Sequence, residues 1–533
     1  MKTTLKFLMG AVLVSGALSA RADSGLGAAM ENADRTESAN AAGRPVPDET
    51  EVLKARRIFD SPVAGLTEIG TLRPRRAKEI VDSRIAIGFE CLDRELFDPN
   101  RCYDLVAESG AKYARCQTGW SRCEKEKGVY DFRWLDDIVD NFARRGVEAW
   151  FDVTFGNTLY MTNCYTKAAV GNVPLYYGEE CKAAWCAYVR ALARHFKGRV
   201  RHWEIWNEAN IRPFWVPHQP DPGDYVKLIA LTAGEIRREI PDARIGAGVS
   251  SVFENPYVSD FIRLGGGKGL DFFCVHPYST APEHLMHWDA KMSYVEAIEA
   301  IRRGFSANGA PAVEVWNGES GYNYWFPKNH WLYGNKEEIC SAGAPAKWLL
   351  RRFLTDRRAG CARSSFFQIV DMVKPYAKSS TVWKRPPRGG LLDGDDYTPR
   401  MSWYALRNYN ALFPAADYDS SLACRAVPGN GNPAFLPLEA VALREGDKLF
   451  FAWWARTAEV RGGYEGRRDG HLTISASACP KDPVVVDLLS GKTYACSLVP
   501  RRSEDGKTVT YDGLPVTDWP LVLTERQNVV VNR

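Results

Sequence analysis

Short apolar runs alternate with amphipathic segments over most of this chain, from about Ser83 to Phe413. The runs have the length and the aromatic and β-branched content of buried strands. They are Ile85–Phe89, Lys112–Cys116, Val147–Val153, His202–Trp206, Ile245–Val249, Phe272–Val275, Val313–Trp316 and Phe366–Val370. This alternation predicts repeated βα units built around a parallel sheet.

The segments between the runs show helical spacing. Apolar side chains fall on one helical face within Trp134–Phe142, Trp185–Phe196 and Tyr225–Ile236. Eight strands, each followed by a helix, predict an α/β fold of the TIM (β/α)8 barrel type over residues 83–413. A doubly wound open sheet is the alternative. The count of eight, and the polar residues at the carboxyl ends of the strands, favour the barrel.

The pattern changes after Phe413. Short strands are expected at Ala440–Leu443, Lys448–Trp454, Leu472–Ser475, Val484–Leu488, Thr508–Tyr511 and Leu521–Thr524. Turn sequences separate several of them, such as Glu445-Gly446-Asp447 and Ser490-Gly491-Lys492. Residues 414–533 are therefore predicted to form a C-terminal antiparallel β-sandwich.

The N-terminal residues have the features of an export signal. Lys2 and Lys6 precede the apolar run Phe7–Leu18, and Ala20-Arg21-Ala22 offers a small-x-small cleavage site. The run is well short of the ~20 residues that span a bilayer, so cleavage is favoured over a membrane anchor. We expect a signal peptide at 1–22, a flexible leader at 23–50 and an N-terminal extension at 51–82. The mature protein is then secreted or periplasmic, without stable membrane insertion.

Charge and cysteine content narrow the function classes. Removing residues 1–22 takes away three cations and no acid, so the formal net charge falls from +4 to +1. A nearly neutral chain gives no indication of a nucleic-acid partner. The 13 cysteines are odd in number, and Cys116–Cys123, Cys164–Cys181 and Cys479–Cys496 could pair, with the connectivity left open. Their spacing does not fit a zinc site, and no metal or cofactor is expected.

Two carboxylates stand where chemistry is expected in a parallel barrel, at the ends of strands. The fourth strand ends in Asn207-Glu208 and the seventh in Gly318-Glu319. Glycosidic bond cleavage needs two carboxyl groups, which stand about 5–5.5 Å apart in retaining enzymes. Strands that face each other across a barrel mouth can bring side chains that close. Glu204 and Glu314 are less suitable, since Glu204 lies deeper in the sheet and Glu314 should face away.

The residues around Glu208 resemble a known signature. Glu204-Ile205-Trp206-Asn207-Glu208-Ala209-Asn210, followed by Phe214-Trp215, resembles the acid/base motif of glycoside hydrolase family 39, within clan A of the barrel hydrolases. Shorter motifs along the chain occur in the same order as in the family. They are Trp120-Ser121-Arg122, Phe155-Gly156-Asn157 with Leu159-Tyr160, His276-Pro277-Tyr278, and Gly390-Leu391-Leu392-Asp393. The resemblance implies that Glu208 is the acid/base, Glu319 the nucleophile, and Asn207 a ligand of the sugar 2-hydroxyl.

Further residues are expected around this pair. Arg115 ends the second strand and would hold the nucleophile ionised. Tyr278 would donate to Glu319, and His276 would bind a sugar hydroxyl. Trp120 and Asn157 would line the pocket.

One departure from the clan concerns the eighth strand. It reads Ser365-Phe366-Phe367-Gln368, where clan members usually carry a tryptophan as the platform for the sugar ring. Phe366 could stack on the sugar instead, or Trp325, Trp331 or Trp383 could reach in from loops.

The sequence therefore predicts a retaining glycoside hydrolase that cleaves an oligo- or polysaccharide by double displacement. A transglycosylase with the same site and a non-catalytic carbohydrate-binding barrel are the alternatives. Family 39 includes β-xylosidases, α-L-iduronidases and endo-acting enzymes on exopolysaccharides. The sugar, its linkage, endo or exo action, and the oligomeric state stay open.

Overall fold

Eight parallel strands close into a barrel whose last strand, β11, pairs with both β8 and β2. The computed structural model describes residues 65–250, 256–279, 282–283, 293–323, 325–326, 338–339, 343–372, 388–429, 438–456 and 468–532. The barrel strands are β2 (Ile85–Gly88), β3 (Tyr113–Gln117), β4 (Glu148–Val153), β5 (His202–Ile205), β6 (Arg244–Ser250), β7 (Phe272–His276), β8 (Glu314–Ser320) and β11 (Arg363–Phe366). The predicted TIM barrel is confirmed.

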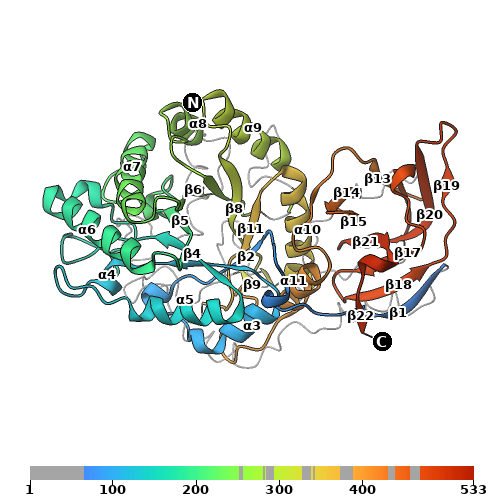
Figure 1. Ribbon diagram of the computed structural model, residues 1–533, viewed down its shortest axis with the longest axis horizontal. Coiled ribbons are helices and arrows are strands. Elements are labelled where there is room, and N and C mark those ends of the chain that lie inside the picture. The colour runs from blue at the N-terminus through green and yellow to red at the C-terminus, as the bar shows by residue number, and fades with distance from the viewer. Residues whose placement is uncertain are drawn as a thin grey trace, which may run out of the picture.

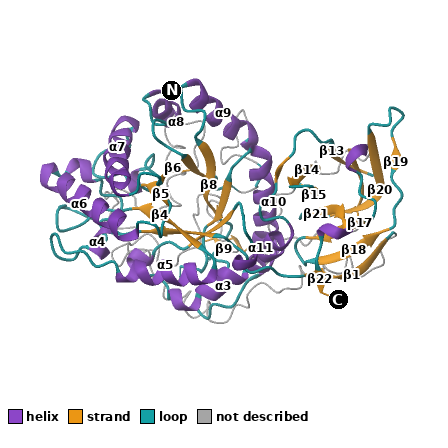
Figure 2. Cartoon of the chain, viewed as in Figure 1, coloured by secondary structure: helices purple, strands orange, loops and turns teal. Residues whose placement is uncertain are grey.

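Helices surround the barrel (Figure 2). They are α3 (Tyr103–Glu108), α4 (Trp120–Cys123), α5 (Arg133–Arg145), α6 (Gly178–Phe196), α7 (Pro222–Glu239), α8 (Pro256–Arg263), α9 (Tyr294–Ala307), α10 (Gly343–Ala359) and α11 (Met401–Leu412). Local sequence sets their starts. Asp221 caps α7 by accepting from the Asp224 amide, and Ser293 with Glu296 forms a capping box on α9.

Aromatic side chains fill the barrel interior. The rings of Phe272 and Trp316 stack with centroids 3.8 Å apart, and Trp150 meets Trp316 edge-on at 5.1 Å. Gly246 is required beside them, because a Cβ there would lie 1.9 Å from a ring atom of Phe272. The interior is thus a packed core, which leaves the carboxyl ends of the strands as the place for a site.

Two antiparallel sheets form the C-terminal part, which lies beside α10 and α11 in Figure 1. The larger sheet has the order β12 (Asp417–Tyr418), β14 (Leu438–Glu445), β15 (Lys448–Ala455), β21 (Leu521–Glu525), β17 (Pro483–Asp487), β18 (Lys492–Cys496), β1 (Leu66–Leu72) and β22 (Val531–Asn532). The smaller has the order β13 (Cys424–Pro428), β16 (Arg468–Ser475), β20 (Thr508–Val516) and β19 (Arg501–Arg502). The predicted C-terminal β-sandwich is confirmed.

The first described strand, β1, belongs to this C-terminal sheet. It comes from the segment predicted as an N-terminal extension, and it pairs with β18 and β22. Figure 1 shows the blue strand among the red ones. The signal peptide, the leader and residues 51–64 lie outside the described residues.

Buried ion pairs join the barrel to the sandwich. Arg351 on α10 donates twice to Glu283, at 2.7 and 2.6 Å, and the indole of Trp454 on β15 donates to the same carboxylate at 2.7 Å. Lys347 on α10 lies 2.9 Å from Asp518. The two parts therefore share a polar interface from which water is excluded.

The last barrel strand lies earlier than predicted. The apolar run suggested Phe366–Val370, whereas β11 spans Arg363–Phe366. Ser364 is hydrogen-bonded inside the protein: Arg357 donates to its hydroxyl, which in turn donates to Asp356. A strand that begins with three polar residues has no apolar run to indicate it.

The twelve cysteines that the structure describes are free thiols, including those of the three pairs suggested from spacing. Within the same described ranges, no helix has the length and apolar content needed to cross a bilayer. Two antiparallel strands of two residues each, β9 (Trp325–Phe326) and β10 (Glu338–Ile339), complete the described strands.

Candidate active site

Glu208 and Glu319 meet at the carboxyl ends of the barrel strands. Glu319 lies in β8, and Glu208 lies three residues beyond the end of β5. One carboxylate oxygen of each, together with a ring nitrogen of His276, lie within 4.8 Å of one another. Both carboxylates are buried, with 3% and 5% of the residue surface exposed. The structure therefore brings together the two acids singled out in the sequence.

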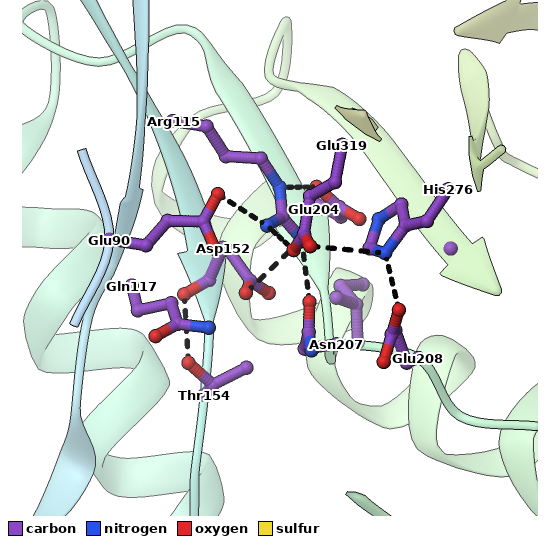
Figure 3. A network of polar contacts seen from close by, with 12 residues as sticks. Glu90, Arg115, Gln117, Asp152, Thr154, Glu204, Asn207, Glu208, His276 and Glu319 are labelled. Atoms are coloured by element: carbon purple, nitrogen blue, oxygen red, sulfur yellow. Dashed lines mark hydrogen bonds and ion pairs between the residues drawn. The ribbon is translucent and has the colours of Figure 1, made fainter. Parts of the chain in front are cut away.

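The backbone at the end of β5 adopts an uncommon conformation. Trp206 and Glu208 have positive φ angles of 68° and 47°, which cost non-glycine residues about 1–3 kcal/mol each. Burial holds them in place: the indole of Trp206 donates to the Phe214 carbonyl at 2.6 Å. Such strain is typical of functional sites, and here the Glu208 side chain points toward His276 (Figure 3).

Arg115 on β3 connects the nucleophile candidate to the base of the site. Its Nη1 donates to Glu319 Oε1 at 2.7 Å, its Nη2 to Asn207 Oδ1 at 3.0 Å, and its Nε to Glu204 Oε2 at 2.7 Å (Figure 3). The guanidinium thereby fixes the orientation of Asn207, as well as the carboxylate that it was expected to hold ionised. Glu204 lies deeper in the barrel, as its strand position predicted.

Tyr278 and His276 bind the two acids from the end of β7. The Tyr278 hydroxyl donates to Glu319 Oε2 at 2.9 Å, as expected from the sequence. The Nδ1 atom of His276 lies 2.9 Å from Glu208 Oε1 and 3.6 Å from Glu319 Oε2. His276, which was expected to bind a sugar hydroxyl, lies with Nδ1 between the two carboxylates.

These contacts shift the pKa values of Glu319 and His276 in opposite directions. Burial opposes the ionisation of Glu319, but the charges of His276 and Arg115 and the hydrogen bond from Tyr278 outweigh it and lower its pKa. Burial alone would lower the pKa of His276, but the charge of Glu319 and the hydrogen bond to Glu208 raise it. The site thus keeps Glu319 ionised, as a nucleophile requires.

Two further buried acids, Glu90 and Asp152, surround Arg115 and were not singled out in the sequence. The Oε1 atom of Glu90, just beyond β2, lies 2.9 Å from Nη1, and Oδ2 of Asp152 on β4 lies 3.3 Å from Nη2. An acid inside the apolar run Val147–Val153 was the available signal for Asp152. Glu90 directly follows another such run.

Four predicted pocket residues have no described contact with the two acids. The ring of Trp120 is fully buried and stacks on Tyr160 and on Tyr188 of α6. Asn157 donates to the Glu124 carbonyl at 2.8 Å, within the same loop cluster.

The other two are the candidates for the sugar platform. Phe366 is buried in the hydrophobic core, whereas the next residue, Phe367, is half-buried. The side chain of Trp325 lies outside the described residues, as do Trp331 and Trp383.

Glu208, His276 and Glu319 are near enough together to hold a cation by distance alone. Their hydrogen bonds to one another, to Tyr278 and to Arg115 already account for these positions. The arrangement is that of a hydrogen-bonded carboxyl pair, suited to moving a proton and to attack on an electrophilic carbon.

Comparison with known proteins finds a family match over the residues that form this site. Residues 100–332, which include Arg115, Glu208, His276 and Glu319, match the family model described as glycosyl hydrolases family 39. This stretch of the chain is therefore similar to the domain of family 39 glycosidases. In this domain the acid/base motif expected from the sequence follows β5, and the second carboxylate lies on β8.

Solved structures of family 39 enzymes share the fold of this chain. A family 39 glycoside hydrolase from the gut symbiont Bacteroides cellulosilyticus WH2 superposes with a TM-score of 0.58 at 15% identity, over 83% of this chain and 81% of that one. A monomeric β-xylosidase from Caulobacter crescentus CB15 gives 0.53 at 16% identity, over 85% and 97%. At these identities the likeness establishes the fold.

A curated relative matches a shorter segment. The β-galactosidase BgaA of Clostridium cellulovorans is 35% identical over 68 residues, which is 12% of this chain. The match spans 10% of the length of that protein.

Proposed function

We propose that this protein is a retaining glycoside hydrolase that cleaves O-glycosidic bonds of an oligo- or polysaccharide by double displacement. One observation carries the proposal: an oxygen of Glu208 and an oxygen of Glu319 lie within 4.8 Å. Retaining enzymes hold the two carboxyl groups about 5–5.5 Å apart, whereas inverting enzymes need about 6.5–9.5 Å to admit a water molecule. The separation favours retention.

In the first step Glu319 attacks the anomeric carbon while the bond to the leaving oxygen breaks. Glu208 gives its proton to that oxygen, and a covalent glycosyl–enzyme ester remains on Glu319. The hydrogen bonds from Arg115 and Tyr278 to Glu319 keep the attacking carboxylate ionised and oriented.

In the second step Glu208, now ionised, takes a proton from water. The water oxygen bonds to the anomeric carbon, Glu319 leaves as a carboxylate, and the sugar is released with its original configuration. His276 lies against Glu208 at 2.9 Å and so fixes the orientation of the group that carries the proton in both steps. The chain of events uses only side chains of this protein and water.

The test is covalent trapping. The protein is incubated with 2,4-dinitrophenyl 2-deoxy-2-fluoro-β-glycosides of xylose, galactose and glucose, and the labelled peptide is mapped by mass spectrometry. We begin with xylose and galactose because the matched proteins include a β-xylosidase and a β-galactosidase. We expect the adduct on Glu319. An adduct on another carboxylate, or a first product with inverted configuration by NMR, contradicts the proposal.

Variants separate catalysis from binding. Glu319→Gln and Glu208→Gln should lose turnover of aryl glycosides. A matched control is Glu314→Gln, since Glu314 lies on the same strand, is partly exposed and pairs with Arg244 away from the site. A non-catalytic binding barrel would show no turnover in the parent protein, and a transglycosylase would transfer the sugar to an added acceptor in preference to water.

We also propose that the mature protein works outside the cytoplasm. The support is residues 1–22, with their basic start, apolar run and Ala20-Arg21-Ala22 site. Expression of the full chain with fractionation and N-terminal sequencing tests it. A new N-terminus at Asp23 in the exported fraction is expected, and an uncleaved chain in the cytoplasm contradicts it.

A further inference from the structure

Glu90 follows the first barrel strand and contacts Arg115, the residue that binds the proposed nucleophile Glu319. It lies two residues beyond β2, and its side chain is 1% exposed. The Nη1 atom of Arg115 is 2.9 Å from Glu90 Oε1 and 2.7 Å from Glu319 Oε1, so both carboxyl groups face one nitrogen (Figure 3). As a hydrogen-bond partner, Glu90 also contributes to the lowered pKa of Glu319. Two carboxyl groups can share a hydrogen bond only if one of them carries a proton.

The charges around Arg115 also require a proton on one of its partners. This single guanidinium lies within 3.3 Å of four carboxyl groups, those of Glu90, Asp152, Glu204 and Glu319. None of these side chains is more than 7% exposed, so water does not screen them. Like charges held this close in a buried site cannot all be ionised, and at least one group keeps its proton.

We propose that Glu90 is a positioning residue for the nucleophile: its carboxyl group keeps its proton at neutral pH and donates it in a hydrogen bond to the Glu319 carboxylate. The inference rests on the proposed function of Glu319. It goes beyond that function by assigning a third carboxyl group, whose proton stays where it is throughout the reaction.

The environment of Glu90 supports this assignment of the proton. Burial raises the pKa of Glu90 well above its usual range, and the charges of Glu319 and Asp152 add to this effect against Arg115. The pKa of Glu319 moves in the opposite direction. Burial raises the pKa of Asp152 as well, but Asp152 lies against Nη2 of Arg115, so Glu90 is the acid that shares Nη1 with Glu319. The titratable and charged groups that face Glu90 are Cys91 beside it, Arg115 and Cys116 on β3, Asp152 on β4, Tyr278 after β7 and Glu319 on β8.

The strength of the proposed hydrogen bond from Glu90 changes with the charge of Glu319 during the reaction. In the free enzyme the nucleophile is ionised and accepts from Glu90 strongly, because hydrogen bonds to a charged group are the stronger kind. In the glycosyl–enzyme ester that charge is gone and the bond weakens. When water releases the sugar the charge returns, so the Glu90 proton stabilises Glu319 as it leaves.

Two variants distinguish a neutral Glu90 from an ionised one. Glu90→Gln keeps a neutral hydrogen-bond donor of the same shape, whereas Glu90→Met keeps the length and removes the donor. The readout is the rate at which Glu319 is labelled, as a function of pH, by the 2-fluoro xyloside or galactoside that labels the parent faster. This rate falls at low pH as Glu319 becomes protonated. The protein is used as the full mature chain, and circular dichroism checks that each variant is folded.

The fall in labelling rate at low pH is the acidic limb of the pH profile. We expect its midpoint in Glu90→Gln to stay within about half a pH unit of the parent, since glutamine is also a neutral hydrogen-bond donor. Glu90→Met should move the limb upward by about one unit or more, which makes labelling about tenfold slower at a pH below the parent's limb. The matched control is Glu124→Gln. This buried acid accepts from Trp120 and Tyr160 away from the site, and its replacement should leave the limb in place.

An ionised Glu90 predicts the reverse. Glu90→Gln would then remove a negative charge beside Glu319 and lower the limb by about one unit or more. That result overturns the inference, as does an unchanged limb in folded Glu90→Met; if Glu90→Met does not fold, Glu90→Gln alone decides. Failure of the proposed function is separate, since the parent protein would then carry no label on Glu319 at any pH.

Discussion

Replacing Tyr278 with phenylalanine removes one hydrogen bond from the nucleophile and leaves the ring. The hydroxyl donates to Glu319 Oε2 at 2.9 Å. A hydrogen bond to a charged group contributes about 1.5–3 kcal/mol. Because about 1.4 kcal/mol corresponds to one pKa unit, the loss should raise the pKa of Glu319 by about 1–2 units.

The sign follows from which form of Glu319 is active. Its pKa lies below the usual carboxyl range, and in the proposed mechanism the ionised form attacks. Activity is therefore present above this pKa and is lost as the pH falls through it. In Tyr278→Phe the loss occurs at higher pH. At a pH below the acidic limb of the parent, kcat/KM should fall about 10–100-fold relative to the parent.

The assay is kcat/KM on an aryl glycoside from pH 3 to 8, roughly the range in which carboxyl groups and histidine titrate. Tyr103→Phe is the matched control, because the Tyr103 hydroxyl donates to the Asp137 carboxylate at 2.8 Å between two outer helices. It should leave the limb where it is in the parent. An acidic limb in Tyr278→Phe that stays in place, or moves to lower pH, refutes the reasoning.

Three other substitutions test the fold and the site. Arg115→Lys loses the guanidinium that donates in three directions, and kcat/KM should fall about 10–100-fold at the optimum, measured on the same glycoside. Glu283→Gln leaves Arg351 charged and buried, and should lower the free energy of unfolding by about 3–5 kcal/mol in urea titration, with turnover per folded molecule unchanged. Gly246→Ala places a methyl group 1.9 Å from the ring of Phe272, and its overpacking should cost about 1–3 kcal/mol or more by the same titration.

The barrel could be predicted from the sequence because its strands are buried on both faces. Seven of the eight predicted runs coincide with strands to within a few residues, since parallel strands in a barrel read as continuous apolar segments. The exception, β11, consists of Arg363-Ser364-Ser365-Phe366 and depends on partners from α10. Tertiary contacts, which a local pattern does not contain, decide such a strand.

Some residues of the candidate site could be predicted from the sequence, and others could not. Glu208 and Glu319 were predictable because they follow an apolar strand or lie near its end, and Tyr278 because it follows β7. Arg115 was expected at a strand end, whereas it lies in the middle of β3. Glu90 becomes part of the site only through register: Gly88, the last residue of β2, lies opposite Arg115, so Glu90 follows two residues later, beside this part of β3.

Trp120 was predicted to line the pocket, but the direction of its side chain could not be read from the sequence. It follows Gly119, which has a φ of 53°, and the resulting turn directs the indole toward α6. The sequence names the residue type, but the direction of its ring depends on the turn.

The position of β1 determines how this chain can be divided. The strand inserts between β18 and β22, so its neighbours in the sheet are more than 400 residues away along the chain. A fragment that starts at residue 414 would lack an inner strand and would leave two edges with unpaired amides, which promotes aggregation. During synthesis β1 must wait for nearly the entire polypeptide before it can pair. Cutting the polypeptide at the barrel boundary would therefore separate two halves that complete each other's architecture.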